Sequence, residues 1–174
     1  MEKKIIEAQL LGNNITSNSK KAYSEFNQFS FGEKIEDKIK YSLPETMFLI
    51  QNGKMKLYSN KKIISQEEAT KKFLRIDKKF LTKYVVFKDL RMKGYIVKTA
   101  LKFGAEFRAY EKGKKIGKSH AKWIIFTDVE ENKTTWHDFA AKNRVAHSTN
   151  KKLLLAIVDE EGQPLYYEIN WIKI

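Results

Sequence analysis

The C-terminal half of the chain is organised around the stretch Tyr95-Ile-Val-Lys-Thr-Ala-Leu-Lys-Phe-Gly-Ala-Glu-Phe-Arg-Ala-Tyr110. Its first residues, 95–97, have the composition of a strand. Apolar residues then alternate with polar ones, which is the period of two expected of a half-buried strand. The alternating apolar residues are Phe103, Ala105, Phe107 and Ala109. We therefore expect a sheet in this half of the chain, with Tyr110 at the end of one of its strands.

The residues after Tyr110 continue this pattern of strands and helices. Residues 123–126 predict a compact strand, and Thr134 or Thr135 can cap a helix that follows. Residues 153–158 and 165–174 predict two more strands, separated by a Gly- and Pro-containing turn. These elements predict a C-terminal α/β domain with a central mixed β-sheet flanked by helices.

The N-terminal half predicts a smaller unit that is richer in helices. We expect a strand over 3–12, a helix over 20–27 capped by Ser17 or Ser19, and a helix with Pro44 in its first turn. The capping-box pattern of residues 65–68 predicts another helix. A long apolar pattern then ends at Gly94, in the position of a C-terminal cap.

The fold class expected is therefore mixed α/β (α+β) with two domains. We place an N-terminal mixed α/β domain at 1–82 and the C-terminal domain at 83–174, with a linking helix over about 78–93.

Charge is the most unusual global property of the sequence. Lysine and arginine number 34 against 21 acidic residues, a formal net charge of +13. Such a surplus favours nucleic acid as a partner, because bound phosphates release their counterions. The lysines are spread along the whole chain, so a general bias toward lysine is the alternative explanation. The charge by itself favours nucleic-acid binding only slightly.

The composition also narrows the setting in which the protein works. Cysteine is absent, which excludes disulfides and thiolate metal sites and fits a reducing compartment. No apolar run approaches the roughly 20 residues of a membrane span, and the start of the chain does not resemble a signal peptide. We expect a cytoplasmic protein without a membrane partner.

Metal and nucleotide chemistry have little support in the sequence. The three histidines, His120, His137 and His147, lack the spacing of a zinc site, and the glycines at 113 and 117 lack the spacing of a phosphate loop. We therefore expect no metal and no cofactor. Metal-free cleavage of RNA remains open, since the 2′-hydroxyl is a nucleophile within the substrate. It needs a base, an acid and a cation.

Three side chains could fill these roles: Tyr110, His120 and Lys151. Histidine suits the acid because its pKa lies near neutrality, and lysine suits the cation. Tyrosine can act as a base if nearby positive charge, such as the lysines between 112 and 118, lowers its pKa. Other roles stay open for each residue: a packing tyrosine, an exposed histidine, and an edge lysine that discourages aggregation.

The order of these residues resembles a known family. The stretch 95–110, then His120, then Arg144-Val-Ala-His-Ser-Thr-Asn-Lys151-Lys152-Leu-Leu-Leu-Ala156, is similar to the archaeal tRNA-splicing endonucleases. The resemblance is close from about 94 to 174. Over the N-terminal half it extends only to size and helix pattern.

The resemblance implies a specific reaction. Members of that family cut introns from precursor tRNA at bulge-helix-bulge sites without a metal, and leave 2′,3′-cyclic phosphate and 5′-hydroxyl ends. It implies Tyr110 as general base, His120 as general acid and Lys151 as the transition-state cation. Lys152 is the rival for the last role and otherwise an RNA-binding residue. The alternative function is a non-catalytic structural or RNA-binding subunit of such an endonuclease.

The resemblance also implies an assembly. It assigns Arg144 and Trp171 to holding a bulge base, and Asp159, Glu160 and Glu161 to an acidic loop that inserts into another subunit. The C-terminal strands would pair subunits. A homotetramer and a heterotetramer with a structural subunit both remain open.

Overall fold

Two compact units make up the chain, one up to Tyr84 and one from Val85 on. The structure, a computed structural model, describes residues 5–114, 116–117 and 119–174. Each unit contains a mixed β-sheet with helices packed on it, which confirms the mixed α+β class. The boundary expected at residues 82 and 83 stays a prediction.

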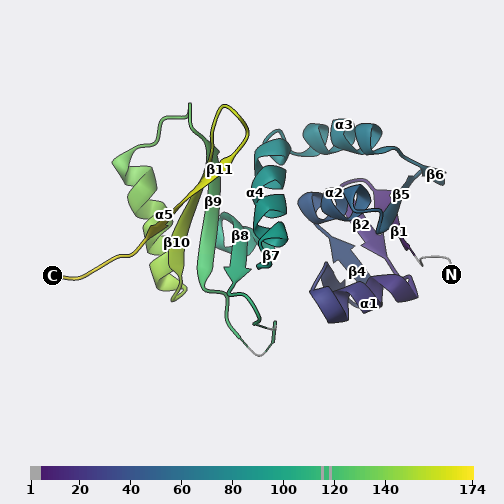
Figure 1. The fold of residues 1–174 in the computed structure, drawn as a ribbon, viewed down its shortest axis with the longest axis horizontal. Helices are drawn as coiled ribbons and strands as arrows, with labels where there is room; N and C mark the ends of the chain where they lie inside the picture. The colour runs from purple at the N-terminus through teal and green to yellow at the C-terminus, as the bar shows by residue number, and fades with distance from the viewer. Residues whose placement is uncertain (1–4, 115, 118) are drawn as a thin grey trace. The chain divides into compact units, whose positions relative to one another are not determined.

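The sheet of the first unit has the strand order β3-β4-β2-β1-β5-β6 (Figure 1). Its strands are β1 (Ile6–Leu11), β2 (Asn14–Ser17), β3 (Glu33–Ile35), β4 (Lys38–Tyr41), β5 (Met55–Ser59) and β6 (Lys62–Ile63). Strands β1 and β5 are parallel, and the other neighbours are antiparallel. Strands β3 and β4 form an antiparallel hairpin.

Three helices of the first unit begin where the sequence predicts helix starts. They are α1 (Lys20–Phe29), α2 (Leu43–Gln51) and α3 (Gln66–Ile76). The Ser19 side chain accepts from the amide of Ala22, and capping boxes start α2 at Ser42 and α3 at Ser65. A fourth helix, α4 (Phe80–Met92), leads into the second unit. These caps satisfy amides that would otherwise lack partners at the helix starts.

Gly32 is a position in this unit where only glycine fits. Its φ is +75°, and a Cβ there would lie 2.3 Å from Cγ2 of the buried Ile39. Its amide donates to the buried carboxylate of Glu45 at 3.0 Å. The backbone of Gly32 is therefore held between the Ile39 side chain and the Glu45 carboxylate.

We expect Gly32→Ala to lower the free energy of unfolding by about 3 kcal/mol, because left-handed strain and overpacking add. Gly53 is a matched control: its φ is +64°, but nothing lies within 4 Å of a Cβ added there. Gly53→Ala should cost only about 1–2 kcal/mol. Urea unfolding monitored by circular dichroism measures both. Equal losses for the two variants would contradict the steric argument.

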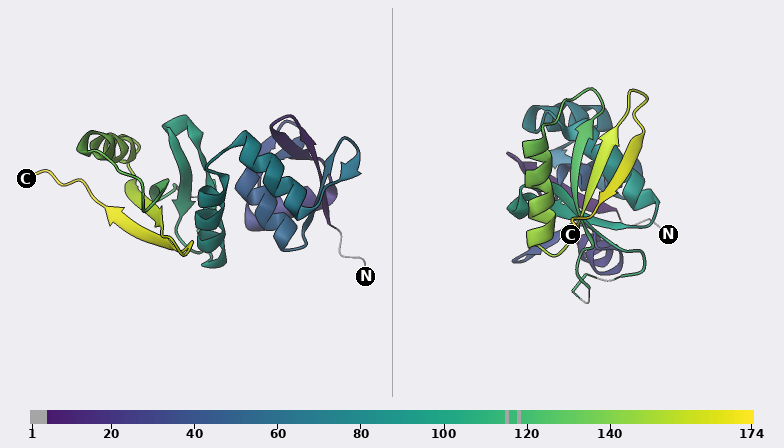
Figure 2. Two further views of the ribbon diagram at one scale, coloured as in Figure 1. Left: turned by 90° about the horizontal axis from the view of Figure 1, so that it is seen from above. Right: turned by 90° about the vertical axis from the view of Figure 1, so that its left-hand side faces the viewer.

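The second unit has the sheet order β11-β10-β9-β8-β7, and Figure 2 shows its strands from two further directions. The strands are β7 (Ile96–Ala100), β8 (Ala105–Tyr110), β9 (Trp123–Val129), β10 (Lys152–Val158) and β11 (Pro164–Ile169). Strands β9 and β10 are parallel and are connected through helix α5 (Trp136–Ser148), which Thr135 caps. The other neighbours are antiparallel.

The two faces of this sheet are covered by different helices. Ile124 of β9 and Leu153 of β10 pack with Ala146 of α5 in one core cluster. On the other face Phe107 of β8 packs against Phe87 of α4, with ring centroids 5.9 Å apart. We call these the α5 face and the α4 face.

One part of the alternating pattern was interpreted wrongly. Residues Leu101–Phe103 form a 3-10 turn, η1, that ends at Gly104 with φ of +70°, so β8 starts only at Ala105. Because of this turn, Phe103 and Phe107 do not share a face as the alternation predicts. Phe103 lies in the cluster on the α5 face, and Phe107 packs on the α4 face. Alternation requires a continuous strand, and the turn interrupts it.

The C-terminal strand is also shorter than expected. It ends at Ile169, and residues 170–174 lie outside any strand. Among the residues described, no helix has the length and apolar character needed to cross a bilayer.

Candidate active site

The end of β8 and the starts of β9 and β10 lie side by side at one edge of the second sheet, where the strands end. Ala109 on β8 pairs with Trp123 on β9, and Trp123 pairs with Lys152 on β10. The amide of Lys122 donates to Ala109, and the amide of Lys152 donates to Lys122, both at 2.9 Å. Tyr110 and Lys151 each lie one residue beyond this row, so the edge brings these two residues together.

Tyr110 is held firmly at the end of β8. It pairs with Ile96 of β7, and only 5% of its surface is exposed. Its hydroxyl makes no hydrogen bond to another described residue. The next residue, Glu111, forms an ion pair with Lys122. That ion pair compensates the charge of the glutamate that follows Tyr110 in the chain.

His120 lies in the loop that joins β8 to β9, and therefore at the same edge of the sheet. Its side chain is exposed, and the next residue, Ala121, is buried. Among described residues no hydrogen bond connects His120 with Tyr110 or Lys151. Of the loop lysines expected to surround Tyr110, Lys115 and Lys118 lie outside the described residues.

The Lys151 side chain lies on the α5 face. Its Nζ donates to the carbonyl of Thr149 at 2.8 Å and lies 5.9 Å from the centroid of the Phe103 ring. Burial lowers the pKa of Lys151, and the positive charges of Arg108 and Lys102 lower it further. Arg108 pairs in register with Ile124, which packs on the α5 face, so Arg108 lies on that face too. Tyr110 is two residues further along the same strand and therefore shares the face.

Lys152 points to the opposite face. Its Nζ forms a 2.6 Å ion pair with Glu168, which also accepts from the indole of Trp123 at 2.7 Å. Trp123 borders a hollow on the α4 face together with Leu90 of α4. The ammonium of Lys152 is thus paired and on the face away from Tyr110.

Thr149 and Asn150 have a clear structural role between α5 and β10. The Thr149 hydroxyl donates to the carbonyls of Val145 and Ala146 at the helix end. Asn150 has φ of +56°, a left-handed conformation that asparagine tolerates well. The amide of Lys151 then donates to Ala146 at 2.9 Å. The two residues end the helix and direct the chain into the strand.

The residues assigned to base holding lie around the last turns of α5. Arg144 is exposed there, and His147 lies three residues further along the same side of the helix. The ring of Trp171 packs edge-on against His147, with centroids 4.1 Å apart, yet the indole stays 58% exposed. Trp171 and Arg144 are thus both near His147, Trp171 by ring contact and Arg144 by its spacing along the helix.

The acidic turn between β10 and β11 divides into two parts. The Asp159 carboxylate accepts from the amide of Gln163 at 2.7 Å, and the Asp159 carbonyl accepts from Gly162. Asp159 therefore holds its own turn. Glu160 and Glu161 are exposed and form no ion pair with another described residue.

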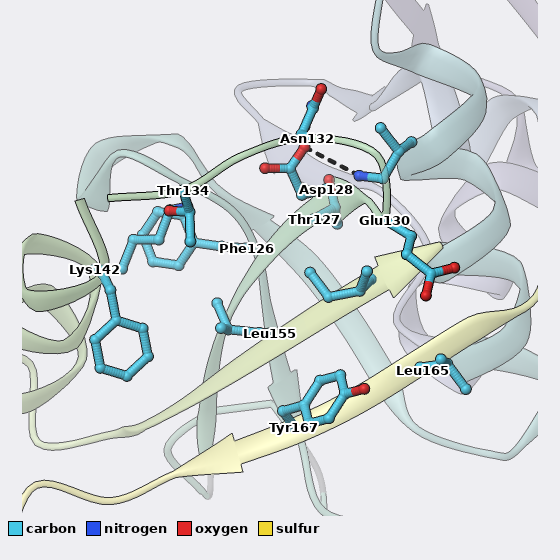
Figure 3. Close-up of a pocket in the computed structure, with 13 residues that line it drawn as sticks. Phe126, Thr127, Asp128, Glu130, Asn132, Thr134, Lys142, Leu155, Leu165 and Tyr167 are labelled. Carbon is cyan, nitrogen blue, oxygen red and sulfur yellow. Dashed lines mark hydrogen bonds between the residues drawn. The ribbon is translucent and has the colours of Figure 1, made fainter. Parts of the chain in front are cut away.

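A hollow of about 240 Å³ opens at the other end of β9, on the α5 side of the sheet. Figure 3 shows Phe126, Leu155 and Tyr167 around it, with Leu165 near its rim. Leu165 and Tyr167 belong to β11, the edge strand, and both are exposed. This apolar surface lies at the end of the sheet away from Tyr110.

The sequence interpretation missed two cations near Lys151. Arg108 and Lys102 both act on its pKa. The signal for Arg108 was present, because residues two apart in a strand share a face and Arg108 precedes Tyr110 by two. Lys102 had no such signal, since it belongs to the 3-10 turn.

Both units of the chain match known proteins of one family. Residues 80–171 match the profile described as "tRNA intron endonuclease, catalytic C-terminal domain", and residues 6–70 match that of the N-terminal domain. A tRNA-splicing endonuclease from Pyrococcus abyssi is 40% identical over 172 residues, 98% of this chain and 99% of the relative. One from Nanoarchaeum equitans is also 40% identical, over 83% of this chain and 97% of the relative. The expectation that the N-terminal half resembles the family only in size and helix pattern was wrong.

Proposed function

Because the chain belongs to the tRNA intron endonuclease family and is an endonuclease of tRNA splicing, we propose that it cuts precursor tRNA at bulge-helix-bulge sites. The cut needs no metal and leaves 2′,3′-cyclic phosphate and 5′-hydroxyl ends. This proposal rests most on one observation: a single sheet edge carries Tyr110 and Lys151, and the loop with His120 joins that edge.

The three side chains supply what the reaction requires. Tyr110 takes the proton of the 2′-hydroxyl, whose oxygen then attacks the adjacent phosphorus. The bond from phosphorus to the 5′ oxygen breaks, and His120 protonates that leaving oxygen. Lys151 stabilises the negative charge that develops on the phosphate oxygens. Its position on the face of Tyr110 supports it over Lys152, whose ammonium is paired with Glu168.

We expect purified protein to cut a bulge-helix-bulge RNA in excess chelator at the same rate as with added Mg²⁺, because all three groups come from the chain. Product ends are read by mass spectrometry: a cyclic phosphate lacks the water that a linear phosphate carries. If the RNA stays intact in chelator and a divalent metal restores cleavage, the metal-free reaction is ruled out. If the RNA stays intact until a partner subunit is added, a heterotetramer is favoured over a homotetramer.

We also propose that the chain acts as an assembly, in which β11 pairs subunits and Glu160 and Glu161 insert into a basic site of another subunit. The exposed apolar side chains of β11 and the tail, Leu165, Tyr167, Trp171 and Ile172, support an interface. Arg144 and Trp171 hold a bulge base by stacking. The absence of cysteine fits action in the cytoplasm.

For the assembly, we expect Leu165→Glu combined with Tyr167→Glu to lower the mass in solution by breaking the strand interface. Glu160→Gln combined with Glu161→Gln should also lower the mass, because the loop loses the charges that bind the basic site of the other subunit. Light scattering during size-exclusion chromatography measures both. A wild-type protein that runs as a monomer at every concentration would refute self-association.

A further inference from the structure

Three cations cluster on the α5 face beside Tyr110. The ammonium groups of Lys102 and Lys151 both lie near the ring of Phe103, with Nζ atoms 5.0 Å and 5.9 Å from its centroid. Arg108 lies on the same face, in register with Ile124 and through it with Leu153. We call Lys102, Arg108 and Lys151 the cation cluster.

No acidic side chain compensates the cation cluster within the described part of the chain. Its three members form no ion pair there, although the neighbouring Lys122 and Lys152 each have a glutamate partner. Like charges brought together without a counterion oppose folding. Such an arrangement gains stability when an anion enters.

The guanidinium of Arg108 has a free donor. Its Nε is buried and has no hydrogen-bond partner among the described residues. A buried donor without a partner is uncommon in native proteins, and a bound anion is one way in which it can be satisfied. The planar guanidinium matches the oxygens of a phosphate group, to which it can donate two parallel hydrogen bonds.

We propose that Lys102 and Arg108 form, together with Lys151, a binding site for RNA backbone phosphates next to the cleaved linkage. Arg108 binds phosphate oxygens beside Lys151, and the exposed Lys102 contacts the neighbouring phosphate of the same strand. Only the assignment of Lys151 to the cleaved linkage rests on the proposed function.

The test uses a bulge-helix-bulge RNA with a 2′-deoxy sugar at the cleavage site, which can bind but cannot be cut. Its affinity is measured against salt concentration for the wild type, Lys102→Gln and Arg108→Gln. Each variant should reduce the slope of log affinity against log salt by about one. Lys88→Gln is the matched control, because Lys88 is an exposed lysine of α4 in the same unit.

Two further measurements guard against misfolding of the arginine variant. Arg108→Lys keeps the charge and should retain the slope but lose part of the affinity, because it lacks the planar fork. In the wild type, the NMR signal of the Arg108 Nε–H should shift on saturation with the 2′-deoxy RNA.

Slopes for Lys102→Gln and Arg108→Gln equal to that of Lys88→Gln, or an unmoved Nε–H signal, would overturn the phosphate site. The 2′-deoxy RNA reports binding alone. A wild type that binds it with these slopes but leaves cleavable RNA intact would refute the proposed cleavage and keep the phosphate site.

Discussion

His120→Ala is expected to slow single-turnover cleavage of precursor tRNA by roughly 10²–10⁴-fold, while affinity for the RNA stays close to that of the wild type. The loss is that of a general acid, because a 5′ alkoxide is a poor leaving group without a proton. The exposed loop position of His120 allows the substitution without loss of packing. Rates are measured with protein in excess over labelled RNA.

A substrate with sulfur in place of the bridging 5′ oxygen makes this test specific. A thiolate leaves without a proton, so His120→Ala should cut the sulfur substrate nearly as fast as the wild type does. His137→Ala is the control, since this exposed histidine lies in the first turn of α5. If sulfur substitution fails to restore the rate, His120 has a role other than proton donation.

Lys151→Met is expected to lower the cleavage rate by about 10²–10³-fold, the usual effect of removing one group that stabilises a developing oxyanion. Lys152→Met should have a much smaller effect, because the Lys152 ammonium is bound to Glu168 on the α4 face. The two variants differ by one position in the chain and remove the same charge. Equal losses would argue against a distinct role for Lys151.

The same substitution should stabilise the fold near neutral pH. The pKa of Lys151 is lowered by burial and by the charges of Arg108 and Lys102, so the charged form is disfavoured in the folded state. Below the lowered pKa this penalty is fully present, and it disappears as pH rises through that pKa toward the unfolded value of 10.5. We therefore expect Lys151→Met to raise Tm at pH 7. The gain should shrink toward pH 10.5, and a lower Tm for Lys151→Met at pH 7 would contradict it.

Local signals in the sequence predicted much of the fold. The serines at 19 and 65 and the threonine at 135 begin helices where their capping chemistry requires. The turn at Leu101–Phe103 was missed, because the apolar alternation continues through it and hides the left-handed Gly104. Local patterns could not show that residues far apart are neighbours across strands.

The candidate site shows the same limit. The sequence and its family resemblance predict Tyr110, His120 and Lys151 as the catalytic residues, which stays a prediction. They could not separate Lys151 from Lys152, since that requires the face to which each side chain points. The β9–β10 register and the Glu168 ion pair supply this information. Arg108 could have been noticed from its spacing to Tyr110. That its Nε has no hydrogen-bond partner in the described part of the chain is visible only in three dimensions.

The end of α5 connects the residues proposed to hold the bulge base with Lys151, the proposed transition-state cation. The backbone and side chain of Lys151 are both attached to this helix end, through the carbonyls of Ala146 and Thr149. Arg144 and His147 lie on the last two turns of the same helix. If Arg144 holds the bulge base as proposed, a shift of these turns on RNA binding would reach the Lys151 ammonium through the two hydrogen bonds.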